Sequence, residues 1–166
     1  LTFTQDKKTD VLMTGIIGKK GMLDKKLYEA LDYAALKKPG KKLFLFHTLL
    51  TQLKPKDLQN MDSQDISLLP KNFDYYAGGH PHFVASNSFS CYNNICYPGP
   101  LFPNSFSELV KLSHGGFFIV DDFVPTYIPL QIYKTSHIFI DGDHKTPAQV
   151  EHLLLNEIMD YPDHIV

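Results

Sequence analysis

Three short apolar runs in the first half of the chain constrain its fold most strongly. They are DVLMTGII (10–17), KKLFLFHTLL (41–50) and FDYYAGG (73–79), and they are separated by polar segments. Short apolar runs that end at glycine or at polar residues are typical of buried strands. The chain therefore predicts an α/β or α+β domain built around a sheet, with helices outside it.

Two segments carry helical signals. Residues 22–36 place Leu23, Leu27, Leu31 and Ala34 on one face, and the motif KKPG follows as a stop signal. Near the end of the chain, Thr146 is a predicted N-cap, followed by Pro147 at the first helical position and by Gln149, which completes a capping box. The apolar stripe of this second helix consists of Val150, Leu153, Leu154 and Ile158.

The middle of the chain has a different texture, with short aromatic and β-branched runs between turn residues. The predicted strands lie in HFVASNSFS (82–90), NICYPG (94–99), GGFFIVDD (115–122) and YIPLQIYK (127–134). The proline-rich segment 98–109 predicts a long loop, and residues 136–144 predict a strand followed by a polar turn. We therefore expect one domain over residues 1–130 and the beginning of a second unit over residues 131–166.

The net charge and the distribution of lysines exclude few classes of function. The net charge of −2 lacks the basic excess of a typical nucleic-acid-binding domain, yet ten of the 16 lysines lie in residues 7–42. We favour a solvated lysine surface and keep open the alternative that lysines such as Lys19, Lys20, Lys25 and Lys26 contact phosphates without sequence preference.

The two cysteines flank the segment YNNI. A two-residue hairpin turn at Asn93 and Asn94 would place Cys91 opposite Cys96, within reach of a disulfide. The sequence shows neither a signal-peptide pattern nor an apolar run of about 20 residues, so we expect no membrane span and a cytoplasmic protein in which both thiols are reduced.

Three histidines follow predicted strands at the points where the strands run into loops. His47 ends the second apolar run, and His80 and His82 follow the third run after Gly78 and Gly79. Residues i and i+2 of an extended segment point the same way, and glycines let the backbone turn tightly. A metal or ligand site at His47, His80 and His82 is one interpretation, and surface histidines without a ligand are the other.

The combination of these segments resembles the calcineurin-like metallophosphoesterases, most closely the nuclease subunit of the Mre/SbcD-type DNA double-strand-break repair complexes. The similarity covers residues 10–125 and rests on LFLFHTLL, FDYYAGGHPH, ICYPGPLFPNSFSEL and GGFFIVDD. The resemblance implies the back half of a β-sandwich flanked by helices, followed by the start of a small α/β capping domain. It also implies that His47 and His80 serve one metal ion and His82 the other.

The resemblance implies a metal-dependent hydrolysis of phosphodiesters at DNA ends. Two divalent ions about 3.5 to 4 Å apart would activate a water molecule, and carboxylate-rich sites of this type suit manganese. The partner implied is an SMC-like Rad/SbcC-type ATPase. A metallophosphoesterase acting on small phosphodiesters and a non-catalytic binding or assembly module are the alternatives.

Three metal-binding motifs of the family have no counterpart in the printed sequence. They are Asp-x-His, Gly-Asp-x-x-Asp and Gly-Asn-His followed by Asp or Glu. We therefore expect the catalytic residues to belong to a missing front half, and the present chain to be an inactive fragment that holds at most one weakly bound ion. We also expect the apolar sheet face that the front half would cover to drive formation of a homodimer.

Overall fold

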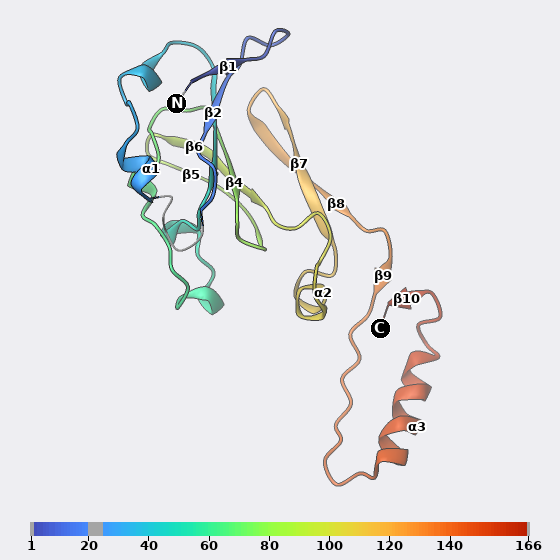
Figure 1. The fold of residues 1–166 in the computed structure, drawn as a ribbon. Helices are drawn as coiled ribbons and strands as arrows, with labels where there is room; N and C mark the ends of the chain where they lie inside the picture. Colours follow the sequence, from blue (N-terminus) through green and yellow to red (C-terminus); the bar gives the residue numbers. More distant parts are fainter. Residues whose placement is uncertain (1, 20–24, 166) are drawn as a thin grey trace. The chain divides into compact units, whose positions relative to one another are not determined.

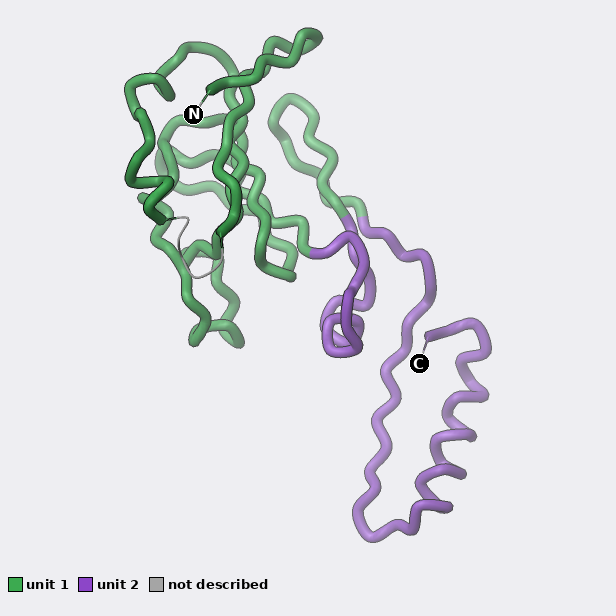
Figure 2. Tube along the Cα trace, in the orientation of Figure 1, with its two compact units in different colours: residues 1–99, 117–128 green, residues 100–116, 129–166 purple. Residues whose placement is uncertain are grey.

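The computed structural model describes residues 2–19 and 25–165. The chain divides into two compact units, one formed by residues 1–99 and 117–128 and the other by residues 100–116 and 129–166 (Figure 2). The predicted boundary near residue 130 lies close to the second entry of the chain into the second unit, and the division into a nuclease and a capping domain stays a prediction.

A six-stranded mixed sheet forms the centre of the first unit (Figure 1). The strand order is β1-β2-β3-β4-β6-β5, in which β2, β3, β4 and β6 run parallel and the two outer strands run antiparallel to their neighbours. The bounds are β1 Thr4–Gln5, β2 Leu12–Gly15, β3 Lys42–His47, β4 Tyr75–Gly79, β5 Val84–Phe89 and β6 Tyr92–Pro98. The three apolar runs thus form neighbouring parallel strands, as expected for buried α/β strands.

The first predicted helix ends earlier than its apolar spacing indicates. In the described part, helix α1 spans Lys25–Glu29, and the chain continues through turns to a 3-10 turn at Ala35–Lys37; residues 22–24 of the prediction lie outside the described part. The carboxylate of Asp32 accepts hydrogen bonds from the backbone N–H groups of Ala34 and Ala35 at 3.0 and 3.1 Å. An aspartate that binds nearby backbone in this way competes with a continuous helix. Ala34, which we expected on the buried face, is exposed, whereas Tyr28 is fully buried.

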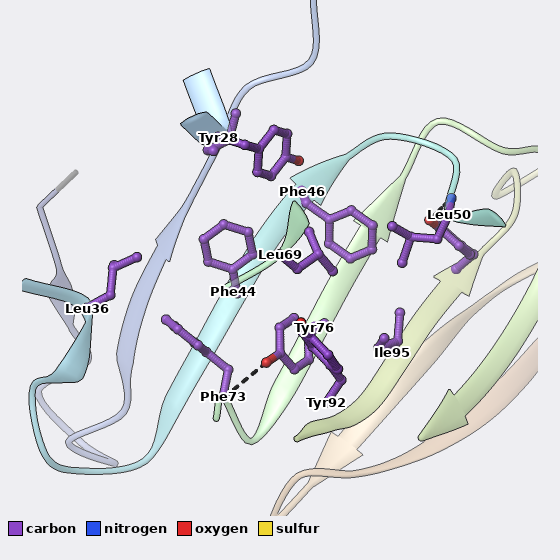
Figure 3. Close-up of a cluster of buried hydrophobic side chains, with 12 residues drawn as sticks. Tyr28, Leu36, Phe44, Phe46, Leu50, Leu69, Phe73, Tyr76, Tyr92 and Ile95 are labelled. Atoms are coloured by element: carbon purple, nitrogen blue, oxygen red, sulfur yellow. Dashed lines mark hydrogen bonds between the residues drawn. The ribbon is translucent and has the colours of Figure 1, made fainter. Parts of the chain in front are cut away.

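One face of the sheet carries the hydrophobic core. Phe44 and Phe46 of β3 alternate with Leu43 and Leu45, and only the phenylalanines are buried. Figure 3 shows Tyr28 and the aromatic side chains packed over the sheet. The cluster consists of Ile16, Tyr28, Leu36, Phe44, Phe46, Leu50, Leu69, Phe73, Tyr76, Tyr92, Ile95 and Tyr97. On the other face Leu45 is 47% exposed.

Two buried tyrosine hydroxyls satisfy backbone groups of the loops below the core. Tyr97 Oη donates to the carbonyl of Thr48 at 2.6 Å and accepts from the N–H of Leu50 at 3.1 Å. Tyr76 Oη donates to the carbonyl of Pro70 at 2.8 Å and accepts from the N–H of Phe73 at 3.2 Å (Figure 3). These bonds help to fix the long connection between β3 and β4, which contains 3-10 turns at Thr51–Leu53, Lys56–Leu58 and Ile66–Leu68 and a parallel β-bridge between Leu50 and Gln64.

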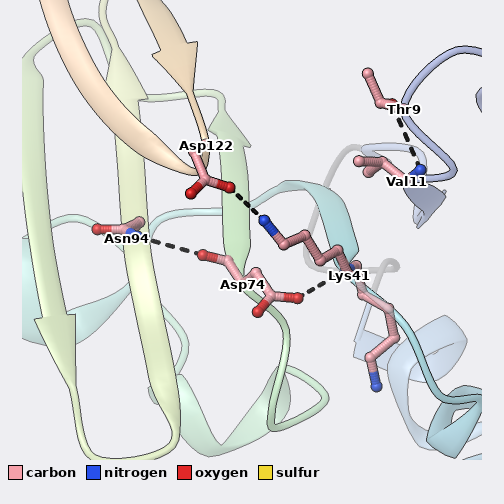
Figure 4. A network of polar contacts seen from close by, with 7 residues as sticks. Thr9, Val11, Lys41, Asp74, Asn94 and Asp122 are labelled. Atoms are coloured by element: carbon pink, nitrogen blue, oxygen red, sulfur yellow. Dashed lines mark hydrogen bonds and ion pairs between the residues drawn. The ribbon is translucent and has the colours of Figure 1, made fainter.

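Polar contacts link the strand ends at the amino side of the sheet (Figure 4). The carboxylate of Asp74 accepts from the backbone N–H of Lys42 at 2.7 Å, and its carbonyl accepts from Nδ2 of Asn94 at 3.3 Å. Lys41 forms an ion pair with Asp122, which lies in the turn between β7 (Gly115–Asp121) and β8 (Val124–Leu130). The Lys41 ammonium also lies 5.3 Å from the ring centre of Phe123.

The predicted turn at Asn93 and Asn94 is wrong. Both asparagines lie within β6, and the chain turns instead at Ser90 and Cys91, whose φ of 66° suits a tight turn. Cys91 is therefore exposed at the turn, while buried Cys96 pairs in register with Ser86, and the two cysteines do not face each other. Burial raises the pKa of the Cys96 thiol, and its Sγ lies 3.2 Å from the Ser86 hydroxyl.

Part of the segment predicted as a proline-rich loop is helical. Helix α2 spans Phe106–Leu112, and the hydroxyl of its N-cap Ser105 accepts from the N–H of Glu108 at 3.2 Å. The carboxylate of Glu108 accepts in turn from the N–H of Asn104 at 2.7 Å. The spacing Ser-x-x-Glu at Ser105 and Glu108 resembles a capping box and could have predicted this helix. The neighbouring prolines led us to expect a loop instead.

The second unit contains α2, a small parallel pair of strands and the last helix. Strand β9 (Lys134–Thr135) pairs with β10 (His164–Ile165), and residues 136–140, which we predicted as a strand, have no regular structure. Helix α3 spans Pro147–Ile158 and begins with the complete capping box of Thr146 and Gln149, as predicted. The Asp-Gly-Asp segment before it is a polar turn in which Asp141 accepts from the N–H of Asp143 at 3.0 Å.

The fold class is therefore mixed α/β, with more sheet than helix. In residues 2–19 and 25–165 no helix is both long enough and apolar enough to cross a membrane. The finer expectation, a metallophosphoesterase sandwich, stays a prediction.

Candidate metal site at the ends of β3 and β4

His47 is the last residue of β3 and pairs in register with Gly79, the last residue of β4. Strand alternation directs its imidazole to the face opposite Phe46, and the side chain is exposed. Because β3 and β4 are parallel, their carboxyl ends lie at one edge of the sheet. In open parallel sheets this edge is where ligands bind.

His80 follows β4 directly and completes a pair with His47. The two ring centres are 5.1 Å apart, and the ring planes meet at 66°. The backbone of His80 has a φ of 92°, which is unusual for a residue other than glycine and costs free energy. Strained residues of this type cluster at functional sites, so the backbone outlier and the ring contact point to the same position.

The spacing of the two rings fits joint coordination of one ion. Two imidazoles that each bind a tetrahedral ion through one nitrogen at about 2.1 Å have ring centres about 5 Å apart. Neutral imidazole suits zinc, copper and nickel better than manganese, which prefers carboxylates. The distance between the ring centres of His47 and His80 thus matches that of two ligands of a single ion.

Three glycines near the carboxyl ends of the parallel strands allow different close contacts. A Cβ on Gly78 would lie 2.4 Å from Tyr97 Cε1 and 2.7 Å from Phe46 Cζ, so this glycine lets two core rings close over β4. A Cβ on Gly79 would lie 2.9 Å from His47 Cδ2, and one on Gly18 would lie 2.3 Å from His47 Nδ1. Gly79 therefore serves the histidine site and Gly78 serves the core, although the sequence predicted one supporting turn for both.

His82 is exposed and lies in the bend between β4 and β5. In the described part of the chain no group of three His, Cys, Asp or Glu side chains is arranged to hold a metal ion. The structure thus brings His47 and His80 together but does not assemble them with His82 into one group. A division in which His47 and His80 serve one ion and His82 another stays a prediction.

Sequence reasoning missed Gly18. It follows β2 by three residues, in the segment GIIG, and it reaches His47 because β2 and β3 are parallel neighbours. A glycine shortly after a strand, at the same sheet edge as two histidines, was the signal that could have identified it.

The lysines for which phosphate contact is the open alternative lie partly outside the described residues. Lys19, Lys25 and Lys26 are exposed, and Lys25 Nζ lies 4.0 Å from the Glu29 carboxylate. Lys20 lies outside the described part. An exposed ion pair of this kind contributes little to stability, so the lysines remain available to either interpretation.

Comparisons with known proteins identify no family for this chain. A scan against protein-family models finds no matching family, and a search of the curated proteins finds no relative.

Proposed function

We propose that this chain is a metal-binding part of a metallophosphoesterase-type DNA nuclease, with His47 and His80 as ligands of one divalent ion. The observation that carries the proposal is the 5.1 Å spacing of two imidazoles at the carboxyl ends of adjacent parallel strands. The motif order in the sequence supports the nuclease subfamily. In this proposal the complete enzyme holds two Mn²⁺ ions, and DNA ends and an SMC-like ATPase are its substrate and its partner.

The residues of this chain would contribute binding rather than proton transfer. The two imidazoles would hold an ion at the carboxyl edge of the parallel strands, and such an ion would polarise a phosphodiester oxygen and lower the pKa of a water molecule. A bridging carboxylate and a general acid are needed as well, and in this proposal they come from motifs that the printed sequence does not contain. The isolated chain would accordingly bind an ion and leave DNA uncut.

Zn²⁺ and Mn²⁺ titrations of the 166-residue chain test the metal assignment. We expect one Zn²⁺ to bind, and to bind more tightly than Mn²⁺, because both identified ligands are nitrogens. His47→Ala and His80→Ala should each weaken Zn²⁺ binding at least tenfold, as measured by calorimetry and by NMR shifts of the imidazole signals. His137→Ala is the matched control, since His137 is an exposed histidine of the other unit.

Equal Zn²⁺ binding by the wild type and by both site variants would refute the metal assignment. Turnover of DNA by the purified chain would refute the division of the active site. In a longer protein that also carries the three absent motifs, His47→Ala, His80→Ala or His82→Ala should abolish Mn²⁺-dependent nuclease activity. Retained activity in the His80 and His82 variants would contradict the ligand set.

The exposed lysines offer a second test, directed at DNA rather than at metal. If they contact phosphates, the logarithm of the DNA affinity should fall with the logarithm of the salt concentration by roughly 0.9 for each neutralised phosphate. Lys→Gln changes at Lys19, Lys25 and Lys26 should then flatten the slope, as should the same change at Lys20. An unchanged slope would restore the solvated-surface interpretation.

A non-catalytic binding or assembly module is the second candidate. The observation in its favour is that the described residues contain no group of three side chains able to hold a metal. A metallophosphoesterase for small phosphodiesters is a third. Absence of Zn²⁺ binding at His47 and His80 would favour the module, and cleavage of a small aryl phosphodiester but not DNA by the longer protein would favour the third.

A further inference from the structure

We propose that Gly18 is a positioning residue that fixes the imidazole of His47. The inference rests on the proposed function in one respect, namely that His47 is a metal ligand. It adds to the site a residue from β2's carboxyl end, so that three adjacent parallel strands contribute to it instead of two.

The contact geometry places the Gly18 backbone over one face of the imidazole. A Cβ built on Gly18 would lie 2.3 Å from Nδ1, 2.6 Å from Cγ and 3.0 Å from Cβ of His47. A point in the ring plane outside the Nδ1–Cγ bond would lie closer to His47 Cβ than the 3.0 Å found, so this position lies out of the ring plane, over the Nδ1 side of one face. Only a residue without a side chain allows the ring to occupy this place.

Gly79 limits the same ring from another direction. A Cβ on Gly79 would lie 2.9 Å from Cδ2 and 3.8 Å from each neighbour of that atom, Cγ and Nε2. This position therefore lies in front of the Cδ2 edge. One face of the imidazole beside Nδ1 and its Cδ2 edge are thus limited by backbone, and Nε2, 3.8 Å from the Gly79 Cβ position, is the nitrogen left for a ligand.

An alanine at position 18 could not be accommodated by a simple rotation of the ring. The collision includes His47 Cβ and Cγ, which belong to the base of the side chain and move little when the ring turns. Gly18 does not have a left-handed backbone, so contact with His47, not backbone strain, opposes the substitution. The imidazole would have to leave its rotamer and separate from His80, 5.1 Å away.

Zn²⁺ titration of Gly18→Ala tests the inference directly. We expect a 10- to 100-fold loss of Zn²⁺ affinity, the range typical when a residue that orients a metal ligand is changed. Gly15→Ala is the matched control for sheet damage, since its Cβ would meet the backbone oxygen of Leu45 at 2.5 Å. It should lower the melting temperature with a smaller effect on Zn²⁺ affinity. Gly142→Ala, whose Cβ would only touch Val150 at 3.8 Å, should change neither property.

A double-mutant cycle supplies a readout that needs no metal. Gly18→Ala should lower the melting temperature by several degrees in the wild type and have almost no effect in His47→Ala, where the colliding side chain is absent. An equal effect in both backgrounds would overturn the inference. Unchanged Zn²⁺ affinity in folded Gly18→Ala would overturn it as well.

The two experiments separate this inference from the proposed function. If the wild type binds no Zn²⁺ but the cycle shows coupling, the contact is confirmed as a packing contact, and the positioning role fails together with the metal assignment. If the wild type binds Zn²⁺ through His47 and Gly18→Ala binds equally well, only the positioning role fails.

Discussion

The two units of the chain are held together in different ways. Among the described residues, the 16 buried hydrophobic side chains all lie between Leu12 and Tyr97, and therefore in the first unit. In the described part of the second unit, α3 buries none of its residues, and Leu153, Leu154 and Ile158 remain 37 to 40% exposed. The first unit thus depends on tertiary packing, whereas the last helix depends on signals within its own sequence.

This difference indicates what each unit can support. A sheet with a packed aromatic core can hold a strained residue such as His80 and two imidazoles in fixed positions. An exposed amphipathic helix keeps its secondary structure through its cap, and its apolar stripe contributes little until something covers it. The described histidine pair belongs entirely to the unit with the core.

The largest effect should follow from a cavity in the first unit. Phe44 is fully buried, with its ring centre 5.3 Å from that of Phe73 and 6.4 Å from that of Tyr76. Phe44→Ala should lower the free energy of unfolding by about 3–5 kcal/mol, because the transfer free energy of the ring is lost and a cavity is left in its place. Urea titration followed by tyrosine fluorescence measures the change. Phe139→Ala, at a side chain that is 86% exposed in the other unit, should leave it almost unaltered; equal effects would erase the contrast between the units.

Alkaline pH should destabilise the first unit nearly as much as Phe44→Ala does. Burial raises the pKa of Tyr75, Tyr76 and Tyr97 in the folded chain. Below the unfolded-state pKa of about 10 both the folded and the unfolded state keep the phenolic proton, and the tyrosines do not reduce the free energy of unfolding. Above it only the unfolded state ionises, so each tyrosine lowers stability by about 1.4 kcal/mol per pH unit.

At pH 11 the three phenols together should cost about 4 kcal/mol. Urea midpoints between pH 9 and pH 11 measure this loss, and Tyr76→Phe should reduce the slope by about one third. Midpoints that do not change with pH would show that these hydroxyls are exposed to water in solution.

The sequence predicted the strands well because their signal is local and repeated. The apolar runs became β2, β3 and β4, and the positions of His47 and His80 at their ends followed from the runs themselves. It failed at two places where the local backbone departs from the pattern. Asp32 ended the first helix early, and Cys91 rather than Asn93 formed the hairpin turn.

The candidate site could be predicted only where its residues are near each other in the sequence or carry an obvious chemistry. His47 and His80 belong to recognisable motifs, but their distance depends on the parallel register of β3 with β4. Gly18 is 29 positions away from His47 and has no side chain to suggest a role. Its contact exists only because β2 lies beside β3, and sequence periodicity does not specify that order.

Removal of the N-cap of α3 should have a smaller effect, and this effect should be confined to the second unit. Thr146 Oγ1 accepts from the N–H of Gln149 at 3.4 Å, and Gln149 Oε1 accepts from the N–H of Thr146 at 2.8 Å. Thr146→Ala should destabilise α3 by about 1 kcal/mol and reduce helical circular dichroism. Because little of α3 is buried, the urea midpoint of the tyrosine signal should stay constant. Thr126→Ala, at an exposed position of β8, is the control; a joint loss of helix and core signals would show that the units unfold together.

The smallest effect concerns two histidines with positive φ, one in each unit. His144 has a φ of 59°, close to the left-handed helical region that polar residues tolerate, whereas His80 has a φ of 92°. His80→Gly should therefore be more stable than His80→Ala by about 0.5–1 kcal/mol, because glycine accepts this backbone without a Cβ contact and its greater entropy when unfolded offsets part of the gain. The corresponding difference at His144 should be smaller, since the residue lies in an exposed turn without a surrounding core. Thermal unfolding of the four variants measures both differences. Equal differences at the two positions would mean that the core of the first unit does not impose strain on His80, and the backbone outlier would no longer support a functional site there.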